Sequence, residues 1–194
     1  MASFAAGNFI LGGHLLDRSD YKDFGLALAE SYFGNYEHTP SRVGPEVFRW
    51  VDAALAANDS HNEPPPAEQR DLYARGGFYA TSPAYILRPE TSESLYYAYR
   101  LTGDPAWQER AWRAFEAIAS LCRAGSAYAP VADVLSPTGG AYMDQMQSFW
   151  LAETLKYLYL IFADELPVQL QLQDGGRSAF VYNTEAHPLR VRQS

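Results

Sequence analysis

Two glutamates three residues apart are the first candidates for acid–base chemistry. Glu90 and Glu93 follow Arg88 and Pro89 at the expected start of a helix, so both side chains project from one side of its first turn. The free backbone N–H groups and the helix dipole there favour ionised carboxylates, which suits a group that takes a proton from water. Acids at helix starts are also common as dipole partners, and Arg88 can either pair with them or orient a sugar hydroxyl.

A second group of polar side chains lies near the C-terminus, where residues 184–188 read Thr-Glu-Ala-His-Pro. A hard cation such as calcium prefers oxygen ligands, and Thr184 can supply two of them, its hydroxyl and its own carbonyl. A histidine such as His187 near a chain end is more often a structural hydrogen-bonding group than a ligand. Taken alone, this segment leaves both interpretations open.

An aromatic and an acid stand one helical turn apart at Phe149 and Glu153. Aromatic faces stack against sugar C–H surfaces while neighbouring acids bind hydroxyl groups, so the pair could line a carbohydrate pocket. The alternative is that Phe149 and Trp150 belong to the core and that Glu153 faces solvent. A glycosylation sequon at residues 58–60 is consistent with a secretory context, although such triplets also occur by chance.

The elements that must position these side chains are mostly helices, because apolar residues recur at three- and four-residue spacing. This periodicity predicts helices over residues 20–34, 45–55, 90–102, 105–121 and 143–162. Residues 58–77 and 166–178 are expected to be loops, and the tail over 180–188 is expected to be short and extended. Paired helices indicate αα-hairpins, in a solenoid or a closed barrel, and the lack of a repeat of about 33 to 47 residues favours the barrel.

Composition excludes several classes of function. The 194 residues are enough for one domain or a piece of a larger one, and a net charge of −8 disfavours nucleic acid as a partner. No apolar run is long enough to span a membrane, and the first residues lack the pattern of a signal peptide. The single cysteine, Cys122, cannot form an internal disulfide.

Four segments, taken in order, closely resemble the C-terminal part of class I α-1,2-mannosidases, glycoside hydrolase family 47. They are residues 85–96, 99–105, 148–160 and 183–189. Ser3-Phe4, residues 7–13 and residues 44–46 also look like landmarks of that family. The resemblance implies an all-α fold, a partial (αα)7 barrel of helical hairpins with a short extended C-terminal segment. It also implies calcium-dependent, inverting hydrolysis of α-1,2-linked mannose from high-mannose N-glycans.

The resemblance also implies a role for each candidate residue. Glu90 matches the general base that activates water, and Thr184 matches the residue that contacts calcium directly, with waters at the other positions. The residues expected to hold those waters or the sugar are Glu46, Arg88, Glu93, Phe149, Glu153 and Glu185. An inverting glycosidase needs an acid and a base about 6.5–9.5 Å apart, with room for water between them, and a hydrated calcium can position that water. No role is carried over for His187.

The chain departs from the family pattern at its N-terminal side. In the family, the catalytic domain is more than twice this length, and the proton-donating carboxylates lie upstream of every segment found here. Ser3 stands where many relatives have a cysteine, and no cysteine occurs near residues 30–32, where its partner would fall. Residues 1–194 are therefore expected to be the C-terminal part of a single catalytic domain whose N-terminal part is missing. With the base present and the acid absent, the polypeptide alone is expected not to hydrolyse mannosides.

Two alternatives remain open from the sequence. The chain could be a mannose-binding or glycoprotein quality-control relative with the same barrel, or a helical scaffold whose acids all lie on the surface. The resemblance places the full-length parent in the secretory pathway, in the endoplasmic reticulum or Golgi, or outside the cell. The sequence leaves the oligomeric state and the preferred mannose of the glycan undetermined.

Overall fold

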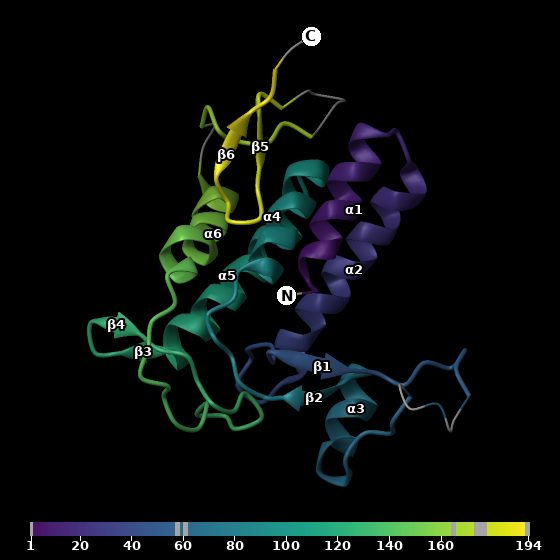
Figure 1. Cartoon of the computed structure of the whole chain (residues 1–194), viewed down its shortest axis with the longest axis vertical. Coiled ribbons are helices and arrows are strands. Elements are labelled where there is room, and N and C mark those ends of the chain that lie inside the picture. Colours follow the sequence, from purple (N-terminus) through teal and green to yellow (C-terminus); the bar gives the residue numbers. More distant parts are fainter. Residues whose placement is uncertain (1, 57–58, 60–61, 164–165, 173–177, 193–194) are drawn as a thin grey trace. The chain divides into compact units, whose positions relative to one another are not determined.

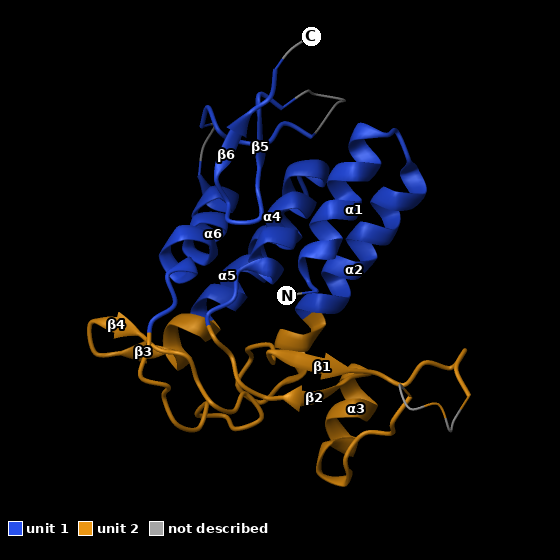
Figure 2. Cartoon of the chain, viewed as in Figure 1, with its two compact units in different colours: residues 1–33, 87–116, 146–194 blue, residues 34–86, 117–145 orange. Residues whose placement is uncertain are grey.

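The computed structural model describes residues 2–56, 59, 62–163, 166–172 and 178–192. The chain divides into two compact units (Figure 2). Unit 1 comprises Met1–Phe33, Leu87–Glu116 and Met146–Ser194, and unit 2 comprises Gly34–Ile86 and Ala117–Gln145. Among the described residues, no helix combines the length and the apolar character needed to cross a membrane.

Unit 1 is built from helices and one β-hairpin (Figure 1). Its elements are α1 (Phe4–Leu15), most of α2 (Ser19–His38), α4 (Glu90–Thr102), most of α5 (Pro105–Leu121), the π-helical turn η2 (Trp150–Thr154), α6 (Leu155–Phe162), and the strands β5 (Phe180–Tyr182) and β6 (Pro188–Arg190). The strands pair antiparallel, with Val181 opposite Leu189, so the extended tail expected from the sequence is a hairpin.

The tight turn between α4 and α5 follows from its residues, as the sequence predicts. Gly103 has a left-handed φ of 67°, and its N–H donates to the carbonyl of Tyr99 at 2.8 Å, which ends α4. The carboxylate of Asp104 then accepts the N–H of Ala106 at 2.9 Å, which satisfies a free donor in the first turn of α5. A tight turn therefore joins the two helices.

Helix α1 is absent from the sequence-based prediction, because Gly7, Gly12 and Gly13 lower the helix propensity of the segment. The packing of α1 on α4 explains Gly7. A Cβ at that position would lie 2.8 Å from the ring of Tyr97, and the N–H of Gly7 donates to the hydroxyl of Ser94 at 3.1 Å. The glycine allows the two helices to approach closely.

Three buried tyrosines join α4, α6 and the hairpin. The ring centroids of Tyr96 and Tyr157 are 5.7 Å apart, and that of Tyr182 is 6.2 Å from Tyr96 and 5.9 Å from Tyr157. The hydroxyl of Tyr96 donates to the side-chain oxygen of Gln169 at 2.8 Å, and that of Tyr182 donates to the carbonyl of Val168 at 3.0 Å. This cluster anchors the hairpin, and therefore its turn at residues 183–187, to the helices.

Unit 2 contains short strands and helices and corrects two expectations. Its elements are β1 (Val47–Arg49), η1 (Ala67–Gln69), α3 (Arg70–Gly76), β2 (Tyr79–Ser82), β3 (Arg123–Ala124) and β4 (Ala127–Tyr128). The helix predicted over residues 45–55 is wrong, because Val47–Arg49 pairs antiparallel with β2. Apolar spacing in so short a run fits a helix or a strand, and the pairing partner decides between them.

The loop expected over residues 58–77 is interrupted by η1 and α3, where Leu72 is buried and the amide of Gln69 bonds to both backbone groups of Ala80. The sequon falls on Asn58 and Ser60, which lie outside the described residues. Cys122, the one cysteine of the sequence, is buried and free, as expected.

The long helix predicted over residues 143–162 is also shorter than expected, because the segment before Trp150 is not an α-helix. Tyr142 forms a bridge with Val131, and the N–H of Met143 donates to the carbonyl of Pro130 at 2.9 Å. The start of the segment is therefore held in extended pairing with residues 130–131 instead of beginning a helix.

Candidate functional site

The start of α4 carries a largely buried carboxylate, that of Glu90. Glu90 is 16% exposed, and its Oε1 lies 3.8 Å from Nη1 of Arg88. Its Oε2 is buried and accepts no hydrogen bond within the part of the chain that the structure describes. Because an unsatisfied buried polar atom costs about 1–3 kcal/mol, this oxygen is suited to a ligand group such as water or a sugar hydroxyl.

Arg88 connects this carboxylate to an aromatic surface. Its guanidinium carbon lies 5.7 Å from the ring centroid of Phe149, within the range of a cation–π contact. Both side chains are partly buried. The structure therefore brings Arg88, Glu90 and Phe149 together, which the sequence proposed from two separate motifs.

Leu87, directly before this motif, has a strained backbone. Its φ is 67°, in the left-handed region that non-glycine residues rarely adopt, and its side chain is fully buried. Such a conformation costs of order 1–3 kcal/mol and persists only where the surrounding structure holds it. Sequence reasoning could not detect this feature, because leucine carries no signal for a positive φ.

Glu93, one turn further along α4, is held largely in its neutral form. Burial raises its pKa to about 8, and the nearby carboxylates of Glu90 and Glu153 add to the rise. The hydroxyl of Tyr157 donates to Oε1 of Glu93 at 3.4 Å and partly offsets these effects. Sequence reasoning missed Tyr157, which looked like an ordinary core residue on an apolar helix.

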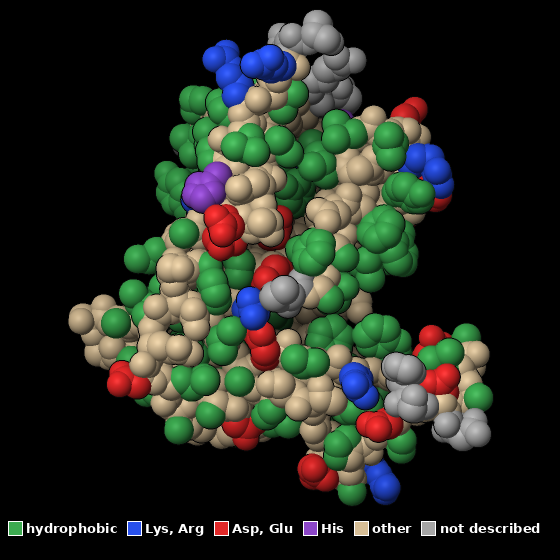
Figure 3. Space-filling view, viewed as in Figure 1, with side chains coloured by type: hydrophobic (Ala, Val, Ile, Leu, Met, Phe, Trp, Pro, Cys, Tyr) green, Lys and Arg blue, Asp and Glu red, His purple; other side chains and the backbone are tan. Residues whose placement is uncertain are grey.

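Glu153 lies on the π-helical turn η2 and forms an acidic cluster with Glu90, Glu93 and Glu185. Burial raises its pKa, and the charges of Glu90 and Glu185 raise it further, whereas Lys156 and His187 lower it. These electrostatic effects link residues from α4, from η2 and from the hairpin turn. Figure 3 shows acidic side chains gathered on the face of unit 1 that carries α4 and the β5–β6 hairpin.

Thr184 and Glu185 form the exposed turn of the β5–β6 hairpin. The side-chain oxygen of Asn183 accepts the N–H groups of Glu185 at 3.1 Å and of His187 at 2.8 Å, which fixes the shape of the turn. The ammonium group of Lys156 donates to the carbonyl of Ala186 at 2.9 Å and ties the turn to α6. Sequence reasoning missed Lys156 and Asn183, although both stand inside the motifs quoted for the resemblance.

Replacing Asn183 with alanine should destabilise the chain by about 1–2 kcal/mol, because two backbone donors lose their acceptor. The free energy of unfolding in urea measures the effect. Asn8→Ala is the matched control, since Asn8 is exposed on α1, and it should change stability by less than about 0.5 kcal/mol. Equal stability of the two variants would contradict a structural role for the Asn183 side chain.

The metal ions that the site could bind depend on its acidic side chains. Within the described ranges, no three histidine, cysteine, aspartate or glutamate side chains converge as metal ligands. The side chains of Glu90, Glu93, Glu153 and Glu185 supply oxygen donors. The charges of neighbouring carboxylates raise the pKa of Glu93 and that of Glu153, a repulsion that a nearby cation would relieve. Oxygen donors of this kind suit a hard cation.

One candidate lies in the other unit. Glu46 belongs to unit 2, where its N–H donates to the carbonyl of Ala84 at 2.7 Å just before β1. Its place relative to the acids of unit 1 stays a prediction. The other expected residues, from Arg88 to Glu185, all lie in unit 1.

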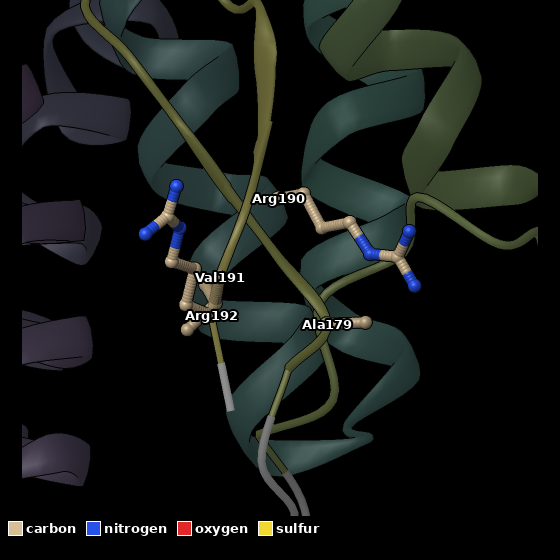
Figure 4. Close-up of a pocket in the computed structure, with 4 residues that line it drawn as sticks. All are labelled: Ala179, Arg190, Val191 and Arg192. Atoms are coloured by element: carbon tan, nitrogen blue, oxygen red, sulfur yellow. The ribbon is translucent and has the colours of Figure 1, made fainter. Parts of the chain in front are cut away.

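A surface hollow of about 510 Å³ lies beside β6 and is lined by Ala179, Arg190, Val191 and Arg192. Figure 4 shows the two arginine side chains extending to opposite sides of the strand. The two side chains do not converge on a common position.

Comparison with known proteins gives consistent matches along the chain. Residues 1–191 match the sequence model of glycosyl hydrolase family 47. The chain is 46% identical, over 197 residues, to a probable mannosyl-oligosaccharide α-1,2-mannosidase 1B of Aspergillus clavatus, and the match covers 100% of this chain and 37% of that protein. It is 40% identical, over 194 residues, to the mannosyl-oligosaccharide α-1,2-mannosidase of Penicillium citrinum, covering 100% of this chain and 36% of that protein.

A solved structure, that of the α-1,2-mannosidase from Trichoderma reesei, is also similar. It matches with a TM-score of 0.92 and 56% identity over 99% of this chain and 38% of that one. The likeness confirms the mainly helical, αα-barrel fold class expected from the sequence. Short strands accompany the helices. The chain spans somewhat more than a third of the length of the relatives that it matches.

Proposed function

The chain belongs to glycosyl hydrolase family 47, and we propose that it carries the water-activating and calcium-binding part of an α-1,2-mannosidase active site. The proposed reaction is the calcium-dependent, inverting hydrolysis of α-1,2-linked mannose from high-mannose N-glycans in the secretory pathway. The relatives' names support the substrate class, since each of those compared is an α-1,2-mannosidase.

The observation that carries this proposal is the buried Oε2 of Glu90, which accepts no hydrogen bond from any residue that the structure describes. Inversion requires a base that removes a proton from water on the face of the sugar opposite the leaving group. Glu90 Oε2 can accept a hydrogen bond from such a water and then take its proton, while Nη1 of Arg88 lies 3.8 Å from Oε1. The resemblance assigns the general acid to none of the residues named here.

The neighbouring side chains are suited to hold the sugar. Glu93, with its pKa near 8, is mainly protonated at neutral pH and can both donate to and accept from a hydroxyl group. The ring of Phe149 offers an apolar face for sugar C–H groups. Glu153 and Glu185 supply acceptors, and the resemblance assigns Glu46 to the same set.

Calcium would be bound by the hydroxyl and carbonyl of Thr184, with water molecules held by the surrounding carboxylates. Bound there, the ion would position water and sugar hydroxyls and favour a distorted ring. The hydrogen bonds of Asn183 and Lys156 support this role, because they fix the turn that contains Thr184 and tie its Ala186 carbonyl to α6.

The test is to titrate the purified chain with an α-1,2-linked dimannoside in a calorimeter, in calcium and in excess chelator. We expect saturable binding in calcium only, weakened at least about 10-fold by Phe149→Ala, which removes the apolar face. We also expect no release of mannose. Lack of binding in calcium would overturn the proposed function, and release of mannose abolished by Glu90→Gln would instead show that the chain has its own acid.

A further inference from the structure

We infer that Thr154 is a positioning residue for the proposed base, because its hydroxyl holds the backbone of Leu87 in the conformation from which Arg88 and Glu90 enter the site. This inference rests on the proposed function for its catalytic meaning. The hydrogen bond from Thr154 to the backbone of Leu87 does not depend on the proposed function.

The contact is short, buried and non-local. Oγ1 of Thr154 donates to the carbonyl oxygen of Leu87 at 2.7 Å, and both residues are fully buried. They are separated by 67 positions in the sequence. A buried carbonyl shielded from water depends on this donor, since solvent cannot replace it.

The hydroxyl of Thr154 does not do what threonine usually does inside a helix. Serine and threonine side chains there commonly donate to the carbonyl four residues earlier, as Thr102 does to Ala98 at 2.8 Å. Thr154 instead points its hydroxyl out of its own helix, at the end of the π-helical turn η2. Such wide turns occur often at functional sites.

The accepting carbonyl of Leu87 sets the direction of the backbone that leads into Arg88. The peptide unit between Leu87 and Arg88 is planar, so a hydrogen bond that fixes the carbonyl of Leu87 also fixes the N–H direction of Arg88. Leu87 has the left-handed φ of 67°, a conformation that its own side chain opposes. The ring of Pro89 restricts the φ of Pro89 itself. The carbonyl of Pro89 accepts the N–H of Glu93 at 2.9 Å in the first turn of α4.

The same bond joins the two halves of the candidate site within unit 1. Phe149 directly precedes η2 and Glu153 lies within it, whereas Arg88 lies in the loop after Leu87 and Glu90 begins α4. Loss of the hydroxyl would let Leu87 relax toward a negative φ and would rotate Arg88 away from Phe149. Thr154 therefore sets how the proposed base and the sugar-binding aromatic face each other.

The experiment compares Thr154→Ala with Thr154→Ser, which differ only by the hydroxyl, and uses Thr102→Val as the control. Two quantities are measured on the full chain: affinity for the α-1,2-linked dimannoside in calcium, and hydrogen exchange of the Glu93 amide. We expect Thr154→Ala to lower affinity at least about 10-fold and to speed exchange of that amide at least about 10-fold. Thr154→Ser should stay within about twofold of the original chain in both, and so should Thr102→Val.

Each outcome decides the matter. Equal affinity and equal exchange in the alanine and serine variants would overturn the inference, because the hydroxyl would then have no positioning role. If Thr154→Ala does not fold, Thr154→Val replaces it, since valine keeps the volume of threonine and lacks the donor. If the original chain does not bind the dimannoside, the proposed function fails, and exchange of the Glu93 amide still shows whether Thr154 holds the loop.

Discussion

Replacing Glu93 with glutamine is expected to raise the free energy of unfolding of the calcium-free chain by about 4 kcal/mol at pH 8. The replacement should also remove much of the pH dependence of that free energy. The physical cause is the raised pKa of Glu93, about 8 against an ordinary value of 4.5, which arises from burial and from the charges of Glu90 and Glu153. Glutamine resembles the neutral acid in shape and still accepts the hydrogen bond of Tyr157.

The sign of the effect comes from proton binding. Below pH 4.5 the side chain of Glu93 is protonated in both the folded and the unfolded chain, so folding is not opposed. Between pH 4.5 and about 8 the folded chain keeps a proton that the unfolded chain has lost, and stability falls by about 1.4 kcal/mol per pH unit. Above pH 8 both states are ionised and the loss is complete.

Urea unfolding between pH 5 and pH 8 measures this slope. Glu116→Gln serves as the control, because Glu116 is exposed on α5 and its replacement should leave the slope unchanged. Glu93→Gln should unfold with nearly the same free energy at both pH values. A slope in Glu93→Gln equal to that of the original chain would contradict the assignment of a buried, neutral Glu93.

Calcium is expected to protect the chain against heat, and Thr184→Val should abolish most of that protection. A ligand at 100 times its dissociation constant stabilises the folded state by about 2.7 kcal/mol, or roughly 5–10 °C for a chain of this size. Valine keeps the shape of Thr184 and removes the hydroxyl that would bind the ion. We expect the dissociation constant to rise by at least about 10- to 100-fold.

Thermal unfolding in calcium and in excess chelator tests this prediction. Thr138→Val is the matched control, because Thr138 is exposed in a loop of unit 2 and should keep the full response to calcium. If calcium does not shift the melting temperature of the original chain, the proposed metal site is wrong. If Thr184→Val keeps the shift, the ion is bound by other residues.

Local features of this protein could be derived from the sequence, because they depend on neighbours along the chain. Pro89 and Glu90 mark the start of α4, and the Gly103-Asp104-Pro105 break ends it, since these residues act on their own backbone. The order of the motifs was also enough to identify the family, which the match over residues 1–191 confirms. Short apolar runs were less informative. The apolar spacing around Val47–Arg49 predicted a helix, but this segment pairs as strand β1 with β2.

The properties that would make the site work were decided only by the tertiary structure, because they depend on burial and on contacts between distant segments. The sequence names Glu93 as an acid, but burial among Glu90, Glu153 and Tyr157 keeps it neutral. The sequence shows Leu87 before the Arg88-Pro89 motif. Only the structure shows that Leu87 has a left-handed φ and that its carbonyl accepts a hydrogen bond from Thr154. Residue types and their order determined which chemistry was available, and packing determined the charge and direction of each group.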